Sequence, residues 1–288
     1  MIDSAFGLVE AASLDNGLPF APANGLSSPD LRRVTPRIAP CHNCPAVRYL
    51  CVSDLHANLE AFTAVLNQVK RKKFDGVLCM GDVVDYGASP NPVTHLLMAQ
   101  ANVTLIRGNH ERAALGIDNA ESFNPVARTS AVWTGQKLDD KSRRYLNSAQ
   151  LGPLSIAPGV ILCHGSPYDE DAYLLSDYDA LLGFEHCEFD VALFGHTHYA
   201  SAFIHHGARI QLLLPHKFPH TVALEPGKRY LINPGSVGQP RDRNPEAAYG
   251  ILDLKARTFT FRRSPYDIAG AQRRIRQAVL PEQLAARI

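Results

Sequence analysis

Residues 47–58 read VRYLCVSDLHAN, an apolar run followed at once by an aspartate and a histidine. The run 47–52 is typical of a short buried β-strand. Residues 58–71 predict a helix, because their apolar side chains recur on one helical face and the last residues are basic. Asp54 and His56 therefore lie in the turn that joins a predicted strand to a predicted helix.

The same alternation of strands and helices continues to about residue 200. Further apolar runs predict strands at residues 76–80, 103–106, 159–163 and 190–194. A helix is predicted over residues 91–100, where prolines suit the first turn, and residues 125–150 look helical in two pieces. This order of elements is typical of an α/β protein.

Beyond residue 200 the pattern changes to β segments separated by Gly- and Pro-containing turns. These segments lie at residues 209–214, 229–233, 249–254 and 258–263. A final basic helix is predicted over residues 267–279, and we interpret its arginines as a solvated face. Alternating β and α elements followed by several strands predict a layered α/β fold with at least one largely parallel sheet.

The composition is that of an ordinary globular protein and argues against several classes of partner. Of the 288 residues, 45% are hydrophobic and 20% are charged, and the formal net charge is +1. A near-neutral chain without a basic stripe does not favour nucleic acid as a partner, except as a small nucleotide substrate. No apolar run of the interior approaches the roughly 18 residues of a membrane span, so we expect no membrane partner.

The first 46 residues differ from the rest of the chain. Residues 1–46 are rich in Pro, Ala, Ser and Asn and lack sustained periodicity, which predicts an irregular N-terminal extension. Regular structure is expected to begin at Val47, so residues 47–288 are expected to form the functional domain. Within the extension, Cys41 and Cys44 form a lone Cys-x-x-Cys, a weak signal for metal binding or redox chemistry.

Three of the other four cysteines indicate a reducing compartment. Cys51, Cys79 and Cys163 each lie in an apolar run, where a free thiol acts as a small hydrophobic side chain. The N-terminus lacks the basic start and apolar core of a secretory signal. We therefore expect a cytoplasmic protein rather than one built on disulfides.

Each of the five strands predicted before residue 195 is followed directly by ionisable or amide side chains. The stretches VSDLHAN, GDVVDYG, RGNHER, CHGSP and GHTH contribute Asp54, His56, Asp82, Asp85, Asn109, His110, Glu111, His164, His196 and His198. Sites in parallel α/β sheets form beyond the carboxyl ends of strands, so we expect the five strand ends to deliver these side chains to one common sheet edge. Histidines outside these stretches are expected in exposed loops at positions His205, His206, His216 and His220.

The ordered set D-x-H, G-D-x-x-D, G-N-H-E, H-G and G-H-x-H resembles the calcineurin-like metallophosphoesterase superfamily. The match spans residues 47 to about 200. The stretch INPGSVGQPRD (232–242) resembles the closing strand and loop of the small bacterial and archaeal phosphodiesterase branch, which extends the similarity to about residue 260. The resemblance implies a four-layer α/β/β/α sandwich in which two mixed β-sheets are flanked by helices.

By motif position, the resemblance also implies two divalent metal ions. Asp54, His56 and His198 would bind one ion, Asn109, His164 and His196 the other, and Asp82 would bridge them. Nitrogen and oxygen ligands suit Mn²⁺, Fe or Zn²⁺, and such a site also accepts Ni²⁺ or Mg²⁺; we expect Mn²⁺. By the same resemblance, the two ions would supply a bridging hydroxide as nucleophile, so the implied reaction is hydrolysis of a phosphoester.

The resemblance assigns His110 to proton transfer rather than to metal binding. As a general acid it would protonate the leaving group, help that is typically worth about 10²- to 10⁴-fold in rate. Asp85 would orient the His110 imidazole. We interpret Glu111 as a residue that structures its loop through hydrogen bonds to the backbone.

One position departs from the pattern of the Ser/Thr protein phosphatases in this superfamily. Those enzymes read G-D-x-x-D-R-G, and the arginine grips phosphate. This chain has Tyr86 there, which favours the phosphodiesterase branch. Arg241, which follows the NPGSVGQP loop, is a candidate replacement as a phosphate contact, and a plain surface arginine is the alternative.

The sequence leaves two other functions open. One is a phosphomonoesterase, phosphoprotein phosphatase or dinucleotide-polyphosphate phosphatase that uses the same site. The other is a metal-dependent binding scaffold without catalysis, against which the full ligand set and His110 argue. The sequence does not specify the substrate, the metal used in the cell or the oligomeric state.

Overall fold

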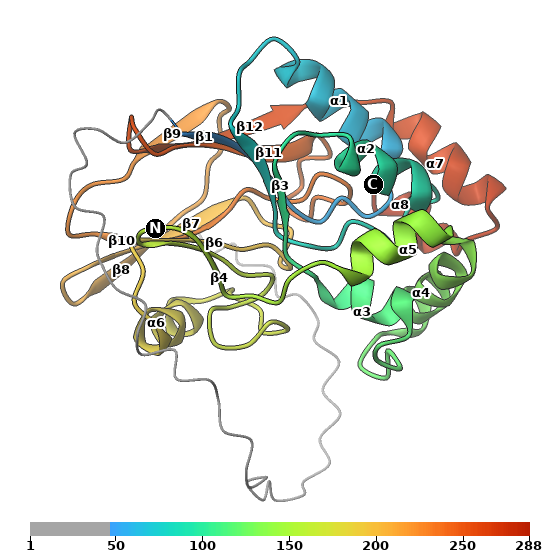
Figure 1. Cartoon of the computed structure of the whole chain (residues 1–288), viewed down its shortest axis with the longest axis horizontal. Helices are drawn as coiled ribbons and strands as arrows, with labels where there is room; N and C mark the ends of the chain where they lie inside the picture. Colours follow the sequence, from blue (N-terminus) through green and yellow to red (C-terminus); the bar gives the residue numbers. More distant parts are fainter. Residues whose placement is uncertain (1–46) are drawn as a thin grey trace, which may run out of the picture. The chain divides into compact units, whose positions relative to one another are not determined.

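The computed structural model describes residues 47–288, and Figure 1 shows how its elements are arranged. The expected extension over residues 1–46, with Cys41 and Cys44, lies outside the described residues. In the described part, two six-stranded sheets pack face to face and helices flank them. The α/β/β/α sandwich implied by the sequence motifs is confirmed.

The first sheet combines parallel and antiparallel pairing. Its strand order is β3 (Val103–Leu105), β2 (Gly76–Cys79), β1 (Arg48–Val52), β11 (Ala247–Asp253), β12 (Thr258–Ser264) and β9 (His220–Ala223). Strands β1, β2 and β3 are parallel to one another, whereas β11, β12 and β9 extend the sheet by antiparallel pairing. The carboxyl ends of the three parallel strands consequently share one edge of the sheet.

The second sheet repeats this plan with different strands. Its order is β4 (Leu154–Ala157), β5 (Val160–Leu162), β6 (Val191–Leu193), β10 (Arg229–Asn233), β7 (Ser201–His206) and β8 (Arg209–Leu213). Strands β5, β6 and β10 are parallel, and the outer pairs are antiparallel. Both sheets are therefore mixed, with a parallel core of three strands each.

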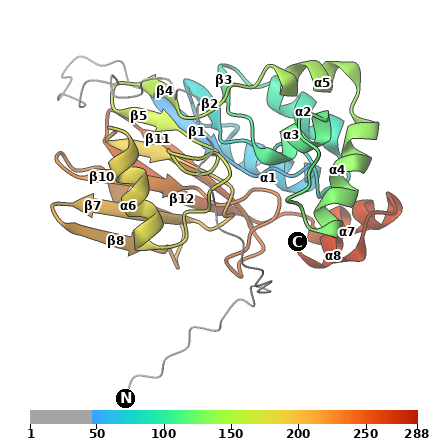
Figure 2. The same ribbon diagram turned by 90° about the horizontal axis from the view of Figure 1, so that it is seen from below.

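Helices cover the outer faces of the sandwich. On the first sheet pack α1 (Leu59–Val69), α2 (Pro90–Met98) and α5 (Asp140–Asn147). On the second lies α6 (Asp177–His186), which Figure 2 shows crossing strands β10, β7 and β8. The remaining helices are α3 (Asn109–Leu115), which contacts α4 (Pro125–Lys137), and α7 (Ile268–Gln277), which contacts both α1 and α8 (Glu282–Ala286).

The alternation of side chains along β1 explains why four layers form. Leu50 and Val52 belong to the apolar cluster under the helices, whereas Cys51 between them belongs to the cluster between the two sheets. Strand side chains alternate between faces, so a fully apolar run is stable only when both faces are covered. Full burial of a large side chain such as Phe62 on α1 contributes about 1.5–3 kcal/mol to stability.

The turn after β1 is held by the start of α1. The Asn58 side chain accepts a hydrogen bond from the backbone N–H of Ala61 at 3.1 Å and so caps the helix. Its Nδ2 donates to the carbonyl of Gly238 at 2.9 Å. The turn that carries Asp54 and His56 is thereby tied to the loop that follows β10.

Several short elements are absent from the sequence expectations. The pattern predicts none of β4, β7, β9, α3, α6 and α8, which are short or lack a clear apolar period. The structure corrects the expectation of exposed loops for His205 and His206, which lie in β7, and for His220, which lies in β9. His216 is an exposed loop residue as expected.

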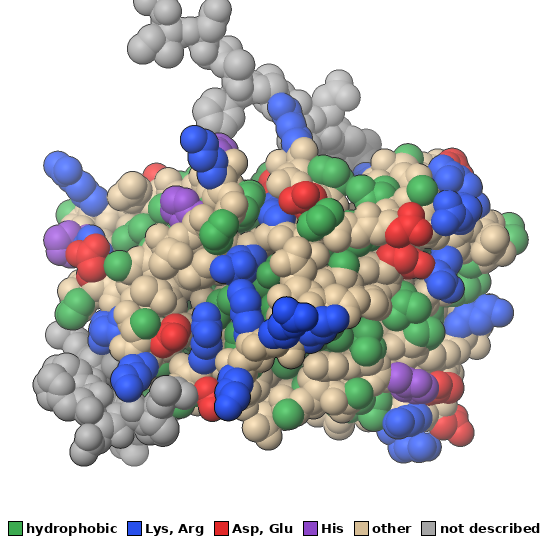
Figure 3. All heavy atoms as spheres, turned by 90° about the horizontal axis from the view of Figure 1, so that it is seen from above, with side chains coloured by type: hydrophobic (Ala, Val, Ile, Leu, Met, Phe, Trp, Pro, Cys, Tyr) green, Lys and Arg blue, Asp and Glu red, His purple; other side chains and the backbone are tan. Residues whose placement is uncertain are grey.

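Basic side chains gather on the face that lies uppermost in Figure 1. Figure 3 shows Lys and Arg side chains across the middle of this face, which carries α1. Burial and the charges of Arg262 and Arg48 lower the pKa of Lys72, so these cations lie close together. None of the three is a candidate site residue. Among the helices of residues 47–288, none has the length and apolar character to cross a membrane.

Candidate metal centre

The site residues meet where the carboxyl ends of parallel strands from both sheets come together. Asp54 and His56 follow β1, Asp82 and Asp85 follow β2, Asn109 and His110 follow β3, His164 follows β5, and His196 and His198 follow β6. The strand ends thus belong to two sheets, three in the first and two in the second, rather than to one common sheet edge. The site lies at the junction of the sheets.

Ligand-type atoms of these residues form two groups in which all atoms lie within 4.8 Å of one another. We call Asp54, His56, Asp82 and His198 the first cluster, and Asp82, His164 and His196 the second cluster. Every member is buried. Asp82 belongs to both clusters, so the two groups are directly adjacent.

The two histidines of the first cluster present unshared electron pairs to each other. His56 Nδ1 lies 3.1 Å from the carbonyl oxygen of Val84, and His198 Nδ1 lies 2.6 Å from that of Gln239. A carbonyl only accepts, so each Nδ1 carries the proton. The two Nε2 atoms, 3.1 Å apart, are then both acceptors. Burial and mutual proximity lower the pKa of His56 far below its usual range, so a proton does not join the pair.

The two carboxylates each keep one buried oxygen free of hydrogen bonds. Asp54 Oδ1 accepts from the backbone N–H of His196 at 3.0 Å, and Asp82 Oδ1 accepts from that of His110 at 3.1 Å. The second oxygens, Asp54 Oδ2 and Asp82 Oδ2, have no hydrogen-bond partner among the described residues. Burial and repulsion from Asp82 raise the pKa of Asp54. Buried carboxylate oxygens of this kind require a compensating positive charge.

His164 in the second cluster is held in the same way as the first-cluster histidines. Its Nδ1 donates to the carbonyl of Met80 at 2.7 Å. Its Nε2 lies 3.0 Å from Asn109 Oδ1 and 3.5 Å from Asp82 Oδ2, all acceptors when the ring is neutral. Burial alone would lower the pKa of His164, but the carboxylates of Asp82 and Asp54 outweigh it and raise the pKa. The position attracts positive charge.

His196 is oriented by a different kind of partner. Its Nε2 donates to the carbonyl of Asp171 at 3.0 Å, which leaves Nδ1 as the ligand atom. Burial and the neighbouring His164 lower the pKa of His196 to about 3. The ring is therefore neutral and presents an unshared pair, as a metal ligand must.

This donor set fits divalent cations. Imidazole nitrogens, carboxylate oxygens and one amide oxygen converge here, and several histidines are held from behind by backbone carbonyls, as metal ligands usually are. Mixed nitrogen and oxygen donors suit Mn²⁺, Fe or Zn²⁺. Asp54, His56, Asp82 and His198 could hold one ion, and Asp82, Asn109, His164 and His196 a second.

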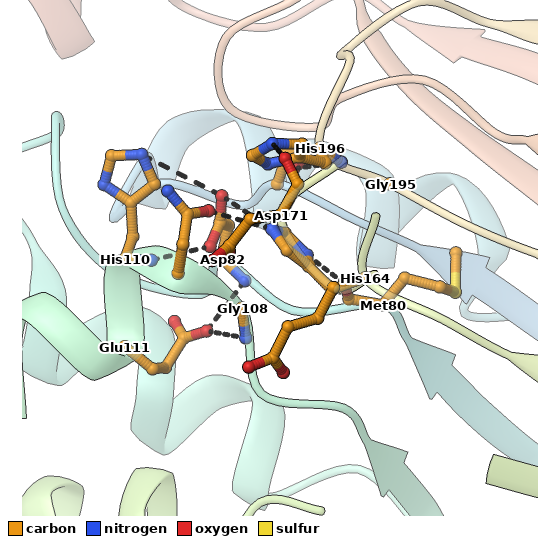
Figure 4. Close-up of polar contacts among 12 residues, drawn as sticks. Met80, Asp82, Gly108, His110, Glu111, His164, Asp171, Gly195 and His196 are labelled. Carbon is orange, nitrogen blue, oxygen red and sulfur yellow. Dashed lines mark hydrogen bonds and ion pairs between the residues drawn. The ribbon is translucent and has the colours of Figure 1, made fainter. Parts of the chain in front are cut away.

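His110 lies beside the clusters and is paired with Asp85. His110 Nδ1 is 2.5 Å from Asp85 Oδ2, while Nε2 is 4.0 Å from Asp82 Oδ2. Figure 4 shows His110, Asp82, His164 and His196 pointing toward a common centre. Burial alone would lower the pKa of His110, but Asp82 and Asp85 outweigh it and raise the pKa to about 9. With Nδ1 held by Asp85, the Nε2 side of the ring faces Asp82.

Glu111 organises the backbone under the site. Its carboxylate accepts hydrogen bonds from the backbone N–H groups of Asp82, Val83 and Gly108 at 2.9, 2.7 and 2.8 Å. Figure 4 shows it below Asp82, facing Gly108. The interpretation of Glu111 as a residue that structures its loop agrees with these contacts. It joins the turn after β2 to the first turn of α3.

The turns that carry the ligands are conformationally strained. Six site residues have φ between 46° and 73°: Asp54, His56, Asp82, Asp85, His196 and His198. Each such left-handed residue costs roughly 1–3 kcal/mol, which the surrounding structure must offset. Gly108 permits the close approach, because a Cβ there would lie 2.1 Å from Asp82 Oδ1. Strain gathered at a buried polar centre is typical of a functional site.

Comparison with known proteins agrees with this geometry. The profile of the calcineurin-like phosphoesterase superfamily domain matches residues 47–257, more than half of the chain. This chain belongs to the calcineurin-like phosphoesterase superfamily. Together with the Asp/His clusters, membership identifies the protein as a metal-dependent phosphoesterase.

Similar proteins match this chain over most of its length. A Methanocaldococcus jannaschii protein described only as uncharacterized is 35% identical over 242 residues, which cover 82% of this chain and 95% of the relative. The crystal structure of a metallophosphoesterase from Sphaerobacter thermophilus is 34% identical, with a TM-score of 0.73, and covers 84% of this chain and 98% of that one. A hypothetical protein from Pyrococcus horikoshii shares the fold at 20% identity and a TM-score of 0.66, covering 83% and 96% of the two chains.

In this metallophosphoesterase the arginine position of the protein phosphatases is filled by a packed aromatic ring. The centroid of the Tyr86 ring lies 4.5 Å from those of both His56 and His110. Burial raises the pKa of Tyr86, whereas the charge of Arg241 opposes that shift. The Arg241 charge also helps to lower the pKa of His198, so this guanidinium lies close to the first cluster.

Sequence reasoning missed the residues that hold the ligands from behind. Val84, Met80, Asp171 and Gln239 act through backbone carbonyls, which no residue pattern reveals. Two aromatic rings were also missed. Phe123 contacts His110 with 4.6 Å between centroids, and Tyr173 contacts His196 with 4.0 Å.

Proposed function

We propose that this phosphoesterase is a binuclear metal-dependent hydrolase that acts preferentially on phosphodiesters. The observation that carries the proposal is the pair of clusters that share Asp82, with His110 beside them. Two divalent cations bound there would activate water for attack at phosphorus and stabilise charge on the ester oxygens. Asp54, His56 and His198 would hold one ion, and Asn109, His164 and His196 the other, with Asp82 shared.

The side chain that would assist bond cleavage is His110, which would donate a proton to the leaving group. Asp85 holds the Nδ1 side of the His110 ring, so Nε2 faces the centre. Protonation of the departing alkoxide from Nε2 would stabilise the charge that develops as the P–O bond breaks. Asp85 acts through His110 as an orienting residue.

The preference for diesters rests on the charge of the substrate. A phosphomonoester dianion carries one more negative charge than a diester and gains more from additional cations. Tyr86 supplies no cation where the protein phosphatases have arginine. Arg241 remains as a phosphate contact in this proposal, because its charge acts on the first cluster and its backbone N–H donates to the carbonyl of His198 at 3.3 Å.

The test compares two esters of one leaving group. Protein stripped of metal and reloaded with Mn²⁺ is assayed with bis-p-nitrophenyl phosphate and with p-nitrophenyl phosphate. Faster diester turnover supports the proposal, whereas faster monoester turnover supports a monoesterase or phosphoprotein phosphatase. Two bound ions without hydrolysis of any ester would instead indicate a binding scaffold.

Metal identity and location complete the proposal. We propose Mn²⁺ as the working ion, since the donor atoms are nitrogen and oxygen without thiolate. We propose the cytoplasm as its location. Cys51, Cys79, Cys163 and Cys187 are free thiols, three of them buried, which suits a reducing compartment.

A further inference from the structure

The loop that follows His164 packs directly on the site. We call residues 166–173 the strap. A Cβ on Gly165 would lie 2.5 Å from the carbonyl oxygen of Glu170 and 2.8 Å from that of Ala172. The strap can therefore approach the backbone after β5 this closely only because Gly165 has no side chain. Through the carbonyl of Asp171 it also sets the orientation of His196.

Arg112 clamps the strap to the helix that carries His110. Its Nη2 donates to both carboxylate oxygens of Asp171 at 2.7 and 2.6 Å, and its Nη1 lies 2.7 Å from Glu170 Oε1. A further hydrogen bond runs from Nε to Asp118 at 3.1 Å. The Arg112 side chain is only 12% exposed. Charge-assisted hydrogen bonds to a guanidinium this well buried are stronger than those between neutral groups, so they hold the strap on α3.

Tyr173 at the end of the strap is half-exposed although its ring packs against His196. Its ring lies against His196, with 4.0 Å between centroids and 32° between planes, yet 46% of the residue is exposed. The aromatic rings around His110 differ. Tyr86 is only 7% exposed and is enclosed by its neighbours, and Phe123 is half-buried. Tyr173 thus offers a free aromatic surface next to a proposed metal ligand.

We propose that Tyr173 stacks on a planar group of the substrate, which assigns the substrate to phosphoesters of aryl alcohols or nucleosides. The inference rests on the proposed function, because the phosphate is taken to bind at the clusters. An aromatic side chain stacks on any planar ring, whether aryl group or nucleobase. Since Arg112 holds the strap, little conformational freedom is lost when the ring binds.

The test measures binding rather than turnover. Methyl phosphate, phenyl phosphate and a nucleoside 5′-monophosphate are titrated into Mn²⁺-loaded protein by calorimetry. Phenyl phosphate is expected to bind about 5- to 100-fold more tightly than methyl phosphate. Tighter binding of the nucleoside monophosphate than of phenyl phosphate would identify the ring as a nucleobase, and equal binding would identify it as an aryl group.

Two variants isolate the ring itself. Tyr173→Phe keeps the aromatic surface and should keep the selectivity, whereas Tyr173→Leu keeps apolar bulk on His196 and should bring the phenyl-to-methyl ratio close to one. Arg112→Gln should lower the same ratio while Tyr173 is still present. A wild-type ratio near one, or a ratio that survives in Tyr173→Leu, overturns the role of Tyr173.

The two proposals fail differently. Hydrolysis of a dialkyl phosphodiester needs no planar group and should occur in the wild-type protein. A wild-type protein that cleaves this ester but binds methyl and phenyl phosphate equally contradicts only the stacking proposal. A metal-loaded protein that cleaves no phosphoester contradicts the proposed function and the stacking proposal with it.

Discussion

The two clusters are supported from different parts of the molecule. The histidines of the first cluster are held by carbonyls of Val84 and Gln239, both in turns packed against the core. In the second cluster, His196 depends on the carbonyl of Asp171, whose side chain is 52% exposed. One cluster is thus anchored by the sandwich itself, and the other partly by a surface strap.

This difference matters because the free energy of opening varies across a protein. Segments packed in the core open only at a cost close to global unfolding, whereas surface loops open more readily. A ligand oriented by a loop is lost whenever the loop opens. We therefore expect the first cluster to bind its ion more tightly than the second, and the clamp by Arg112 to limit the difference.

The largest effect should follow removal of the residue that the clusters share. Asp82→Asn removes a carboxylate charge from both ions. Replacing residues that merely orient a ligand costs about 10- to 100-fold in metal affinity, so loss of this ligand should cost more than about 100-fold at both clusters. Elemental analysis after dialysis measures it, with hydrolysis expected at background level. Two full equivalents retained by the variant would show that Asp82 is no shared ligand.

A large effect without metal loss should follow change at His110. In our assignment His110 belongs to neither cluster, so His110→Ala should retain both ions. Turnover should fall by about 10²- to 10⁴-fold on substrates with poor leaving groups and much less on p-nitrophenyl esters. The measurement is kcat across a series of leaving groups with metal content as the control. An unchanged dependence on the leaving group contradicts the role of His110.

Loss of the clamp should affect one cluster only. Arg112→Gln frees the strap and should weaken the second ion by about 10-fold or more, while the first ion stays bound. The matched control is Arg276→Gln, which breaks an exposed pair with Glu282 and should leave both ions in place. Calorimetric titration with Mn²⁺ resolves the two equivalents. Equal weakening of both equivalents would refute the distinction between the clusters.

The smallest effect is the difference in affinity between the two ions in the wild-type protein. Titration of the Mn²⁺-loaded wild type with a chelator should release the ions in two steps, the second-cluster ion first. An affinity difference of about tenfold corresponds to about 1.4 kcal/mol, enough to separate the steps. Metal content measured beside activity shows whether turnover is lost with the first ion. Simultaneous release of both ions would mean that the strap holds its cluster as firmly as the core does.

Local pattern was sufficient for the long elements and for the ligands. Three predictions correspond to observed elements: the strand at 47–52, the helix at 58–71 and the basic final helix. They succeeded because burial of one face produces a periodic pattern of apolar residues. The short helix α3 was missed because its seven residues begin with the polar site itself. Strand β9 was missed because its partner in the sheet, β12, is distant in sequence.

The site shows the same division. Asp54, His56, Asp82, His164, His196 and His198 were chosen from the sequence because residue type reveals ligand chemistry, and the structure brings them together in the two clusters. Val84, Gln239 and Asp171 escaped notice because they act through carbonyl oxygens, which every residue has. Tyr173 and Arg112 lie in segments whose residue types do not indicate a functional site. Only their contacts in the structure show that they lie beside the second cluster.

The amino-acid sequence by itself determined the family, the strand-and-helix alternation and the donor atoms available for metal. The tertiary structure decided that the ligands come from two sheets rather than one, that they divide into two clusters sharing Asp82, and that a clamped strap supports one of them. The physical reason is the separation along the chain between the residues involved. Burial periodicity and side-chain chemistry can be read from neighbouring residues. The facing Nε2 atoms of His56 and His198, by contrast, come together only when distant segments pack.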